Sequence, residues 1–120
     1  MAGTENGKCL YNRLLSHMHR VITGFDWDSG NSAKCLKHGL TREEIEAAFV
    51  LGPLIAPDGA HSATEQRFIA IARSTTGRPM FIAFAYRMIG GEMRIRPVSA
   101  RYMHEKERKR YEARTQDEDR

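Results

Sequence analysis

The fold is decided by residues 67–99, whose sequence is RFIAIARSTTGRPMFIAFAYRMIGGEMRIRPVS. β-Branched and aromatic side chains recur in three segments of this stretch, which are Arg67–Arg73, Pro79–Arg87 and Glu92–Ser99. Such residues favour strands, and the two joints, residues 74–78 and 88–91, contain the glycines that tight turns require. We therefore predict two consecutive antiparallel hairpins.

Two short helices are predicted before these strands. A short strand at Phe25–Asp28 is followed by residues 29–32, whose side chains can bond the free amides of a first helix. That helix is expected to end at Gly39, because glycine readily adopts the left-handed conformation found after helices. Thr41 and Glu44 have the spacing of a capping box and predict the start of a second helix.

A small strand and a charged helix complete the predicted fold. Leu54–Ala56 is expected to form the strand, before the turn residues 57–59. The helix is expected from Tyr102 to about Arg114, with an apolar stripe of only Met103 and Tyr111. The fold class is therefore α+β, with an antiparallel sheet of about four strands packed against two N-terminal helices and a C-terminal helix.

The length of 120 residues indicates one small domain. We expect residues 1–20 to be a flexible extension, although an amphipathic helix from Leu10 also fits the spacing of apolar residues. Residues 21–114 are expected to form the domain and residues 115–120 a disordered acidic tail. The chain contains neither an apolar run long enough to span a membrane nor the apolar stretch of a signal peptide, so we expect a cytoplasmic protein.

Positive charge is concentrated towards the C-terminal end. The whole chain has a formal net charge of +4, whereas residues 87–114 alone hold nine Lys and Arg against four Glu. Most of these cations are Arg, whose guanidinium can bind a phosphate or carboxylate through two parallel hydrogen bonds. A polyanion or an acidic partner is the natural target, and a solvated basic helix that keeps the protein soluble is the alternative.

The sequence does not indicate a cofactor or a metal. Cys9 and Cys35 are too few for a disulfide framework or a four-ligand zinc site, so we expect two free thiols in a reducing compartment. Among the five histidines, only His17 and His19 lie close together, and no phosphate-binding glycine loop occurs.

The remaining Arg, His and Glu residues suffice for cleavage of RNA without a metal. In this reaction the ribose 2′-hydroxyl attacks the adjacent phosphate, which requires a base, an acid and cations around the phosphorus. His61 precedes Glu65 by four residues and could be oriented by it as an acid or base, although a histidine that merely caps a loop is an equal alternative. Arg67 and Arg73 share one face of their predicted strand, because side chains alternate with a period of two.

Two further groups of residues could bind phosphate. Arg94 and Arg96 also share a strand face, and with Arg101 they form the strongest candidate cluster, although arginines beside a sheet are often only solvated. Lys37 and His38 could contact RNA, but His38 before a glycine is more typical of a helix end.

A series of short motifs runs from residue 25 to residue 101. The motifs are FDWD at Phe25–Asp28, Lys34, Lys37-His38-Gly39, Thr41–Glu44 with Phe49, Pro57-Asp58, His61-Ser62, Glu65, Arg67 and RIRPVSAR at Arg94–Arg101. Their order and spacing resemble the BrnT family of ribonuclease toxins. The resemblance covers roughly residues 21–112 and leaves residues 1–20 outside it.

The resemblance implies a RelE-like fold, ribonuclease activity and membership of a bacterial type II toxin-antitoxin pair. In such a pair a small BrnA-like antitoxin would block the toxin and repress the operon through its own DNA-binding domain. A homodimer within the toxin-antitoxin complex is also compatible with the resemblance.

These considerations together predict a metal-independent ribonuclease that inhibits translation and is neutralised by its antitoxin. The expected catalytic residues are His61, Glu65, Arg67, Arg96 and Arg101. The expected RNA-binding residues are Lys37, His38, Arg73, Arg94 and Tyr102. One alternative is a non-catalytic subunit that binds an antitoxin or nucleic acid. Another is an interaction protein that binds no nucleic acid and therefore shows no salt-dependent RNA binding.

Overall fold

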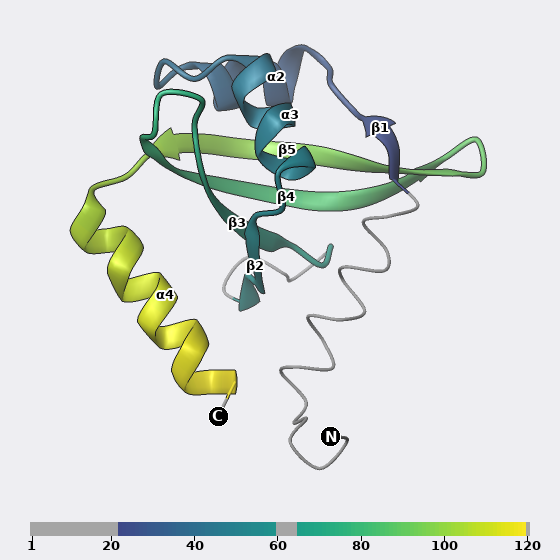
Figure 1. Cartoon of the computed structure of the whole chain (residues 1–120). Helices are drawn as coiled ribbons and strands as arrows, with labels where there is room; N and C mark the ends of the chain where they lie inside the picture. The colour runs from purple at the N-terminus through teal and green to yellow at the C-terminus, as the bar shows by residue number, and fades with distance from the viewer. Residues whose placement is uncertain (1–21, 60–64, 120) are drawn as a thin grey trace.

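The computed structural model describes residues 22–59 and 65–119 (Figure 1). The elements follow in the order β1 (Ile22–Phe25), α2 (Ser29–Leu36), α3 (Arg42–Val50), β2 (Leu54–Pro57), β3 (Phe68–Arg73), β4 (Pro79–Ile89), β5 (Glu92–Tyr102) and α4 (Glu105–Asp119). The predicted α+β class is confirmed. The helix expected from Leu10 and the candidate catalytic residue His61 lie outside the described residues.

The five strands form one mixed sheet in the order β1-β5-β4-β3-β2. Strand β1 lies parallel to β5, with Phe25 beside Ile95, while the other neighbouring strands are antiparallel. The prediction of an antiparallel sheet of about four strands was therefore wrong. The segment before the first helix adds a fifth, parallel strand, and it ends at Phe25 because Asp28 already caps α2.

Both predicted hairpins are confirmed. Strand β3 pairs with β4 and β4 pairs with β5, each in antiparallel register. The turns depend on glycines, because Gly77 and Gly91 have φ angles of 90° and 82°, which side chains other than glycine rarely adopt. Strands β4 and β5 are longer than predicted and end at Ile89 and Tyr102.

Strand β5 contains a bulge at Val98. Ala83 of β4 pairs with Ser99, but the next residue, Phe84, pairs with Pro97. Val98 therefore has no partner across the hairpin. A single extra residue of this kind shifts the alternation of side chains in the rest of the strand.

The bulge determines which arginines of β5 share a face. Arg96 lies opposite Ala85, and Arg101 lies opposite Phe81. Ala85 and Phe81 are on the same face of β4, since an even number of residues separates them. Arg96 and Arg101 consequently lie on one face, although regular alternation along β5 would place them on opposite faces.

Helices α2 and α3 cover one face of the sheet and enclose the core (Figure 1). Phe49 of α3 is almost fully buried and packs edge-on against Phe84 of β4, with 4.8 Å between the ring centroids. Cys35 of α2 is also buried, and burial raises the pKa of its thiol to about 11. Cys35 is therefore a neutral, free thiol inside the core at physiological pH.

The predicted capping box of α3 is confirmed. The backbone N–H of Glu44 donates to Thr41 Oγ1, and the backbone N–H of Thr41 donates to Glu44 Oε1, both at 3.1 Å. Helix α2 is capped in the same way by Asp28 and Asn31, one residue earlier than expected. Gly39 has a φ of 94° just after α2, as the sequence predicted.

Helix α4 packs against the other face of the sheet. Tyr111 of α4 packs against Phe81 of β4, with 5.8 Å between the ring centroids. The helix begins at Glu105 rather than Tyr102, because residues 101 and 102 still belong to β5. It also continues past Arg114 to Asp119, so residues 115–119 are helical rather than a disordered tail. No helix in the described part of the chain is long and apolar enough to cross a membrane.

Candidate functional site

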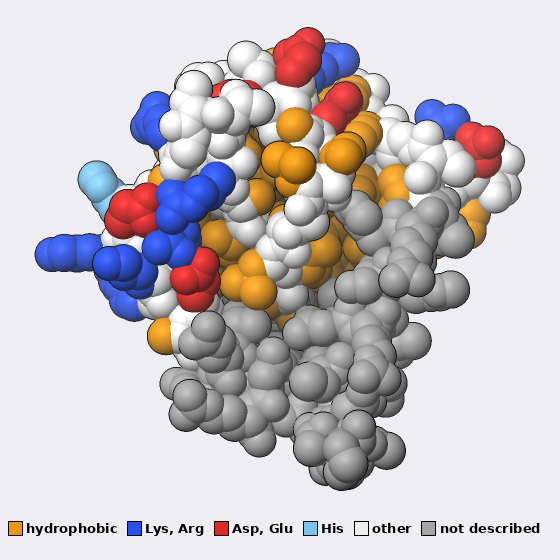
Figure 2. All heavy atoms as spheres, in the orientation of Figure 1, with side chains coloured by type: hydrophobic (Ala, Val, Ile, Leu, Met, Phe, Trp, Pro, Cys, Tyr) orange, Lys and Arg blue, Asp and Glu red, His pale blue; other side chains and the backbone are white. Residues whose placement is uncertain are grey.

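Four arginines of β4 and β5 lie on the face of the sheet that α2 and α3 do not cover. They are Arg87, Arg94, Arg96 and Arg101, and we call this surface the arginine face. Their neighbours on the same face are the apolar residues Phe81, Ala83 and Ala85 of β4. Helix α4 lies at one end of this face, where Lys and Arg side chains alternate with Asp and Glu (Figure 2).

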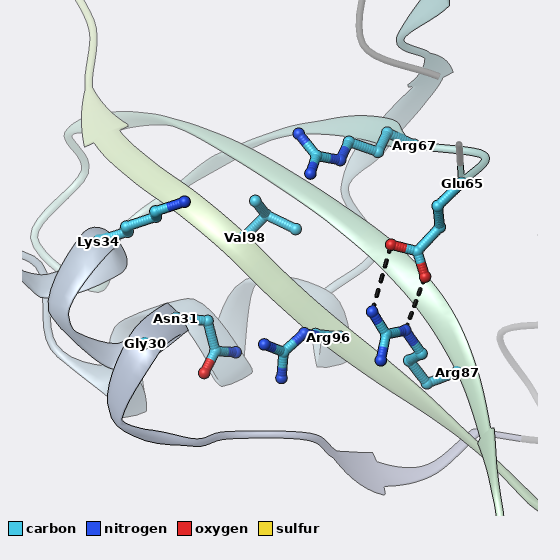
Figure 3. Close-up of a pocket in the computed structure, with 8 residues that line it drawn as sticks. All are labelled: Gly30, Asn31, Lys34, Glu65, Arg67, Arg87, Arg96 and Val98. Carbon is cyan, nitrogen blue, oxygen red and sulfur yellow. Dashed lines mark hydrogen bonds and ion pairs between the residues drawn. The ribbon is translucent and has the colours of Figure 1, made fainter. Parts of the chain in front are cut away.

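A hollow of about 230 Å³ opens where the arginine face meets α2 (Figure 3). Its lining consists of Gly30, Asn31, Lys34, Glu65, Arg67, Arg87, Arg96 and Val98. Figure 3 shows the charged ends of Lys34, Arg67 and Arg96 gathered around the hollow. The lining holds four cations and one glutamate, and two aspartates outside it, Asp26 and Asp28, pair with Arg96. Cations still outnumber carboxylates, so this cationic hollow suits an anionic ligand.

Glu65 is held by Arg87. Arg87 Nε donates to Glu65 Oε2 at 2.6 Å, and Nη2 donates to Oε1 at 3.3 Å. These hydrogen bonds are the main cause of the lowered pKa of Glu65 and of the raised pKa of Arg87. Glu65 is therefore a carboxylate at neutral pH, and it fixes the guanidinium of Arg87 at the edge of the cationic hollow.

Arg96 is fixed by two aspartates that precede α2. Its Nη1 lies 3.2 Å from Asp26 Oδ2, and its Nη2 lies 2.9 Å from Asp28 Oδ2. Asp28 also accepts the backbone N–H of Asn31, which is the largest cause of its lowered pKa. Because the Arg96 side chain is only 19% exposed, its guanidinium has one well-defined orientation in the cationic hollow.

Asn31 ties α2 to the bulged part of β5. Its Nδ2 donates to the carbonyl oxygens of Asp26 at 2.9 Å and Pro97 at 2.8 Å. Its Oδ1 accepts the backbone N–H of Asp28 at 2.7 Å. This buried amide thus satisfies three backbone groups, two in the loop before α2 and one in β5, and sets the position of α2 beside the cationic hollow.

Lys34 follows Asn31 on the same helix and is exposed. Its ammonium group points into the cationic hollow (Figure 3). Within the described residues, no carboxylate forms an ion pair with Lys34. The cationic hollow therefore contains a lysine charge that a phosphate could bind directly.

A second hollow of about 260 Å³ lies farther along the arginine face, towards α4. Its lining consists of Asp58, Arg67, Phe81, Ala83, Ser99 and Tyr111, and we call it the aromatic hollow. Arg67 lines both hollows, so they adjoin each other. A ligand longer than one phosphate group could occupy both.

Arg101 lies beside the aromatic hollow. Its guanidinium carbon is 4.5 Å from the centre of the Phe81 ring, and its Nη2 is 2.7 Å from Oε2 of Glu107 on α4. The hydrogen bonds with Glu107 are the main cause of the raised pKa of Arg101. Arg101 thus already binds one carboxylate, that of Glu107, in the geometry in which it would bind a phosphate.

The structure brings together some of the residues that the sequence suggested. Glu65, Arg67 and Arg96 line the cationic hollow, and Arg101 lies on the same face of the sheet. Arg94 is also on this face but near the β4–β5 turn, where its Nη2 is 3.2 Å from Glu92.

Other suggested RNA-binding residues lie away from the two hollows. Lys37 and His38 are exposed at the C-terminal end of α2. Arg73 forms a 2.8 Å ion pair with Glu105 at the start of α4. Tyr102 lies on the face that the helices cover, and its hydroxyl donates to Glu44 of α3 at 2.9 Å.

The sequence interpretation did not assign a role at the site to Lys34, Arg87 or Asp58. Arg87 could have been found, because the glycine turn places it opposite Arg94 in the hairpin. Lys34 and Asp58 carried no local signal of this kind, since their positions depend on how α2 and β2 pack against the sheet. Among the described residues, no group of His, Cys, Asp and Glu could hold a metal ion.

Comparison with known families gives a match over most of the described part of the chain. A family model described as "Ribonuclease toxin, BrnT, of type II toxin-antitoxin system" matches residues 27–107, which is more than half of the chain. The matched region includes α2, all of β2 to β5 and every residue that lines the cationic hollow. Comparison with curated proteins finds no match.

Proposed function

The chain belongs to the BrnT family of ribonuclease toxins of type II toxin-antitoxin systems, and we propose that it cleaves RNA at the arginine face without a metal ion. In the proposed reaction a ribose 2′-hydroxyl attacks the adjacent phosphorus, and the 5′-oxygen leaves. The products are a 2′,3′-cyclic phosphate and a free 5′-hydroxyl. The reaction requires stabilisation of the additional negative charge that develops on the phosphate oxygens.

The observation that carries this proposal is the convergence of Lys34, Arg67 and Arg96 on one hollow. Cations that are already in position stabilise a developing charge without having to reorganise first. Arg96 meets this condition because Asp26 and Asp28 fix its guanidinium. A guanidinium has five N–H donors, so Arg96 keeps donors for a phosphate while it binds both aspartates.

The acid-base step is assigned from the sequence. We propose His61 as the acid or base, with Glu65 as the carboxylate that orients the site. Glu65 is a weak base, because Arg87 lowers its pKa. This favours a positioning role for Glu65 and leaves proton transfer to a histidine, whose ordinary pKa lies near neutrality.

Family membership implies an antitoxin partner. We propose that this partner is BrnA-like, that it covers the arginine face in a cytoplasmic complex, and that two toxin chains take part in that complex. We further propose that the fold is RelE-like, since α2 and α3 cover one face of the sheet and leave much of the charged face for RNA.

The test is a cleavage assay with purified protein and labelled RNA in the presence of EDTA. Wild type should produce 2′,3′-cyclic phosphate ends, and a single 2′-deoxy substitution at the cut nucleotide should prevent cleavage. Lys34→Ala should lower the rate about 100-fold, as expected for loss of one charge-stabilising group. Lys109→Ala is the matched control, because it removes a lysine charge from an exposed position on α4. Loss of cleavage in EDTA, or equal rates for the two variants, would contradict the proposal.

A non-catalytic binding role is the second candidate, and one observation favours it. Arg87 and Arg101 each hold a glutamate through two hydrogen bonds, so the arginine face readily accepts carboxylates. An antitoxin with acidic side chains could use the same geometry. The same assay separates the two candidates, because this role predicts binding of RNA or antitoxin without any cleavage by wild type.

A further inference from the structure

We propose that residues 10–21, the segment before β1, form a short helix that docks on an apolar hollow between β1 and the end of α3. The segment precedes the described residues and joins β1 directly at Ile22. Its docking would cover an end of the sheet that α2 and α3 leave open. The inference goes beyond the proposed function, because the docking does not depend on what the arginine face binds.

The hollow has a volume of about 300 Å³ and a mainly apolar lining, and we call it the β1 hollow. Ile22 and Phe25 of β1 line it and are half-buried. Phe49 and Ile95 are almost fully buried beside them, whereas Val50 at the end of α3 is 81% exposed. The β1 hollow therefore joins the hydrophobic core to an apolar side chain on the surface.

Apolar side chains continue from the β1 hollow towards the β4–β5 turn. Met88 of β4 is 63% exposed and pairs with Met93 of β5, which in turn pairs with Ile22. Met88 shares the face of the buried Phe84, since an even number of residues separates the two. Figure 1 shows that the β4–β5 hairpin extends past α2 and α3 at this end. The exposed apolar surface is therefore contiguous, as is typical of docking surfaces.

The segment before β1 has a pattern that fits this surface. Its apolar residues recur at helical spacing and would form one stripe. They are Leu10, Tyr11, Leu14, Leu15 and Met18. A helix over residues 10–19 would be about 15 Å long. Residues 20 and 21 then suffice for the turn into β1, because connections of two residues between a helix and a strand are common.

The charges of the two surfaces are opposite. Residues 6–21 contain three Lys and Arg and neither Asp nor Glu. Helix α3 holds three Glu and one Arg, and Glu46 precedes Val50 by one turn on the same side of the helix. A basic segment is attracted to this surface, whereas a second copy of the acidic surface would be repelled. Direct attachment to β1 also gives the segment a high effective concentration.

Docking would stabilise the attachment of β1, which is a strand of four residues at the edge of the sheet. Short edge elements open more readily than central strands. The next residue, Asp26, donates its backbone N–H to the Ile95 carbonyl at 2.8 Å, and its carboxylate pairs with Arg96. A helix over β1 would therefore help to hold Arg96 in its orientation from the opposite face of the sheet.

Hydrogen exchange of the full chain tests the docking. Leu14→Glu places a charge in the apolar stripe, and Ser16→Glu places the same charge on the polar side of the proposed helix. Leu14→Glu should lower the protection factor of the Asp26 amide about tenfold, whereas Ser16→Glu should keep it within about twofold of wild type. The amides between β3 and β4 should be unchanged in both variants, which shows that the domain still folds.

The exposure of position 50 provides a second measurement. Val50→Cys is introduced together with Cys9→Ser, so that the only other thiol is that of the buried Cys35. The introduced thiol should react with a water-soluble maleimide about tenfold more slowly than the same thiol in a protein that also carries Leu14→Glu, because docking covers it. Equal rates would overturn the inference. Equal protection of the Asp26 amide in Leu14→Glu and Ser16→Glu would do the same.

Two other occupants of the β1 hollow give different results. If the Val50→Cys thiol is protected only at concentrations at which sedimentation shows a dimer, a second copy covers the hollow. If it is protected only after antitoxin is added, the antitoxin covers it. Either result would contradict docking of residues 10–21. Protection of the purified monomer that Leu14→Glu abolishes and Ser16→Glu does not is the result that we expect.

Discussion

Arg101 on β5 and Glu107 on α4 form an ion pair with two parallel hydrogen bonds, at 2.7 Å and 3.1 Å. The pair lowers the pKa of Glu107, which therefore stays ionised at neutral pH. A phosphate that binds Arg101 must share or replace this carboxylate. The pair thus links the position of α4 to the availability of Arg101.

Glu107→Gln should increase the affinity for RNA. The side chain of Arg101 is 41% exposed, and ion pairs with this degree of exposure contribute less than about 1 kcal/mol, so we expect a gain of up to about fivefold. Fluorescence anisotropy with a labelled RNA measures the change. Glu112→Gln is the matched control on the same helix, because Glu112 pairs with Arg108 instead. An affinity equal to that of the control would show that Arg101 does not bind the RNA.

Arg101→Lys should reduce RNA cleavage almost as strongly as Arg101→Ala. A lysine keeps the charge but cannot form two parallel hydrogen bonds to one phosphate. Single-turnover rates of the three proteins provide the measurement. If the lysine variant retains the wild-type rate, Arg101 acts only through its charge.

Asn31→Ala should lower the free energy of unfolding by about 2 to 4 kcal/mol, since it leaves buried carbonyl groups without donors and removes part of the helix cap. Urea denaturation measures this loss. Ser29→Ala is a suitable control, because Ser29 is exposed at the start of the same helix. Asn31→Asp keeps an acceptor for the Asp28 amide but loses both donors, so it should also be destabilised. A loss no larger than that of Ser29→Ala would mean that the hydrogen bonds of Asn31 contribute little to stability.

Acid should weaken the attachment of α4. Hydrogen bonds from Arg73, and next from Arg108, lower the pKa of Glu105 from 4.5 to about 2. A lowered pKa stabilises the folded state above pH 4.5, and this contribution disappears as the pH falls towards about 2. The protection factors of the α4 amides, which are corrected for the intrinsic exchange rate at each pH, should therefore fall across this pH window. In Glu105→Gln the protection should be lower at neutral pH and should change less with acid. An unchanged difference in protection between the two proteins at all pH values would contradict the assignment.

Much of the fold could be predicted because its signals are local. The capping box of Thr41 and Glu44 and the glycines of the two hairpin turns each lie within a few residues of the structure that they specify. The parallel pairing of β1 with β5 gave no such signal. Strand β1 has four residues, and its partners around Ile95 are far away along the chain, so only tertiary packing brings them together.

The candidate site was predicted less completely, because faces of strands were assigned by counting. Arg101 and Tyr102 are adjacent, and side chains of adjacent strand residues point to opposite faces, so they could not both contact RNA. The structure places Arg101 on the arginine face and Tyr102 against α3. Counting alone would also have separated Arg96 from Arg101, because it contains no information about the bulge.

The bulge at Val98 makes the pairing of β5 a determinant of its function, separate from its composition. Regular pairing through Val98 would rotate the rest of the strand by half a turn, so Arg101 would face the helices and Tyr102 would lie on the arginine face, with no change of sequence. Deletion of Val98 would instead remove the bulge and leave Arg101 opposite Phe81. Insertions and deletions in this strand therefore need as much attention as substitutions when members of the family are aligned. In a relative without the extra residue, the arginine equivalent to Arg101 should be separated from the equivalent of Arg96 by one residue fewer.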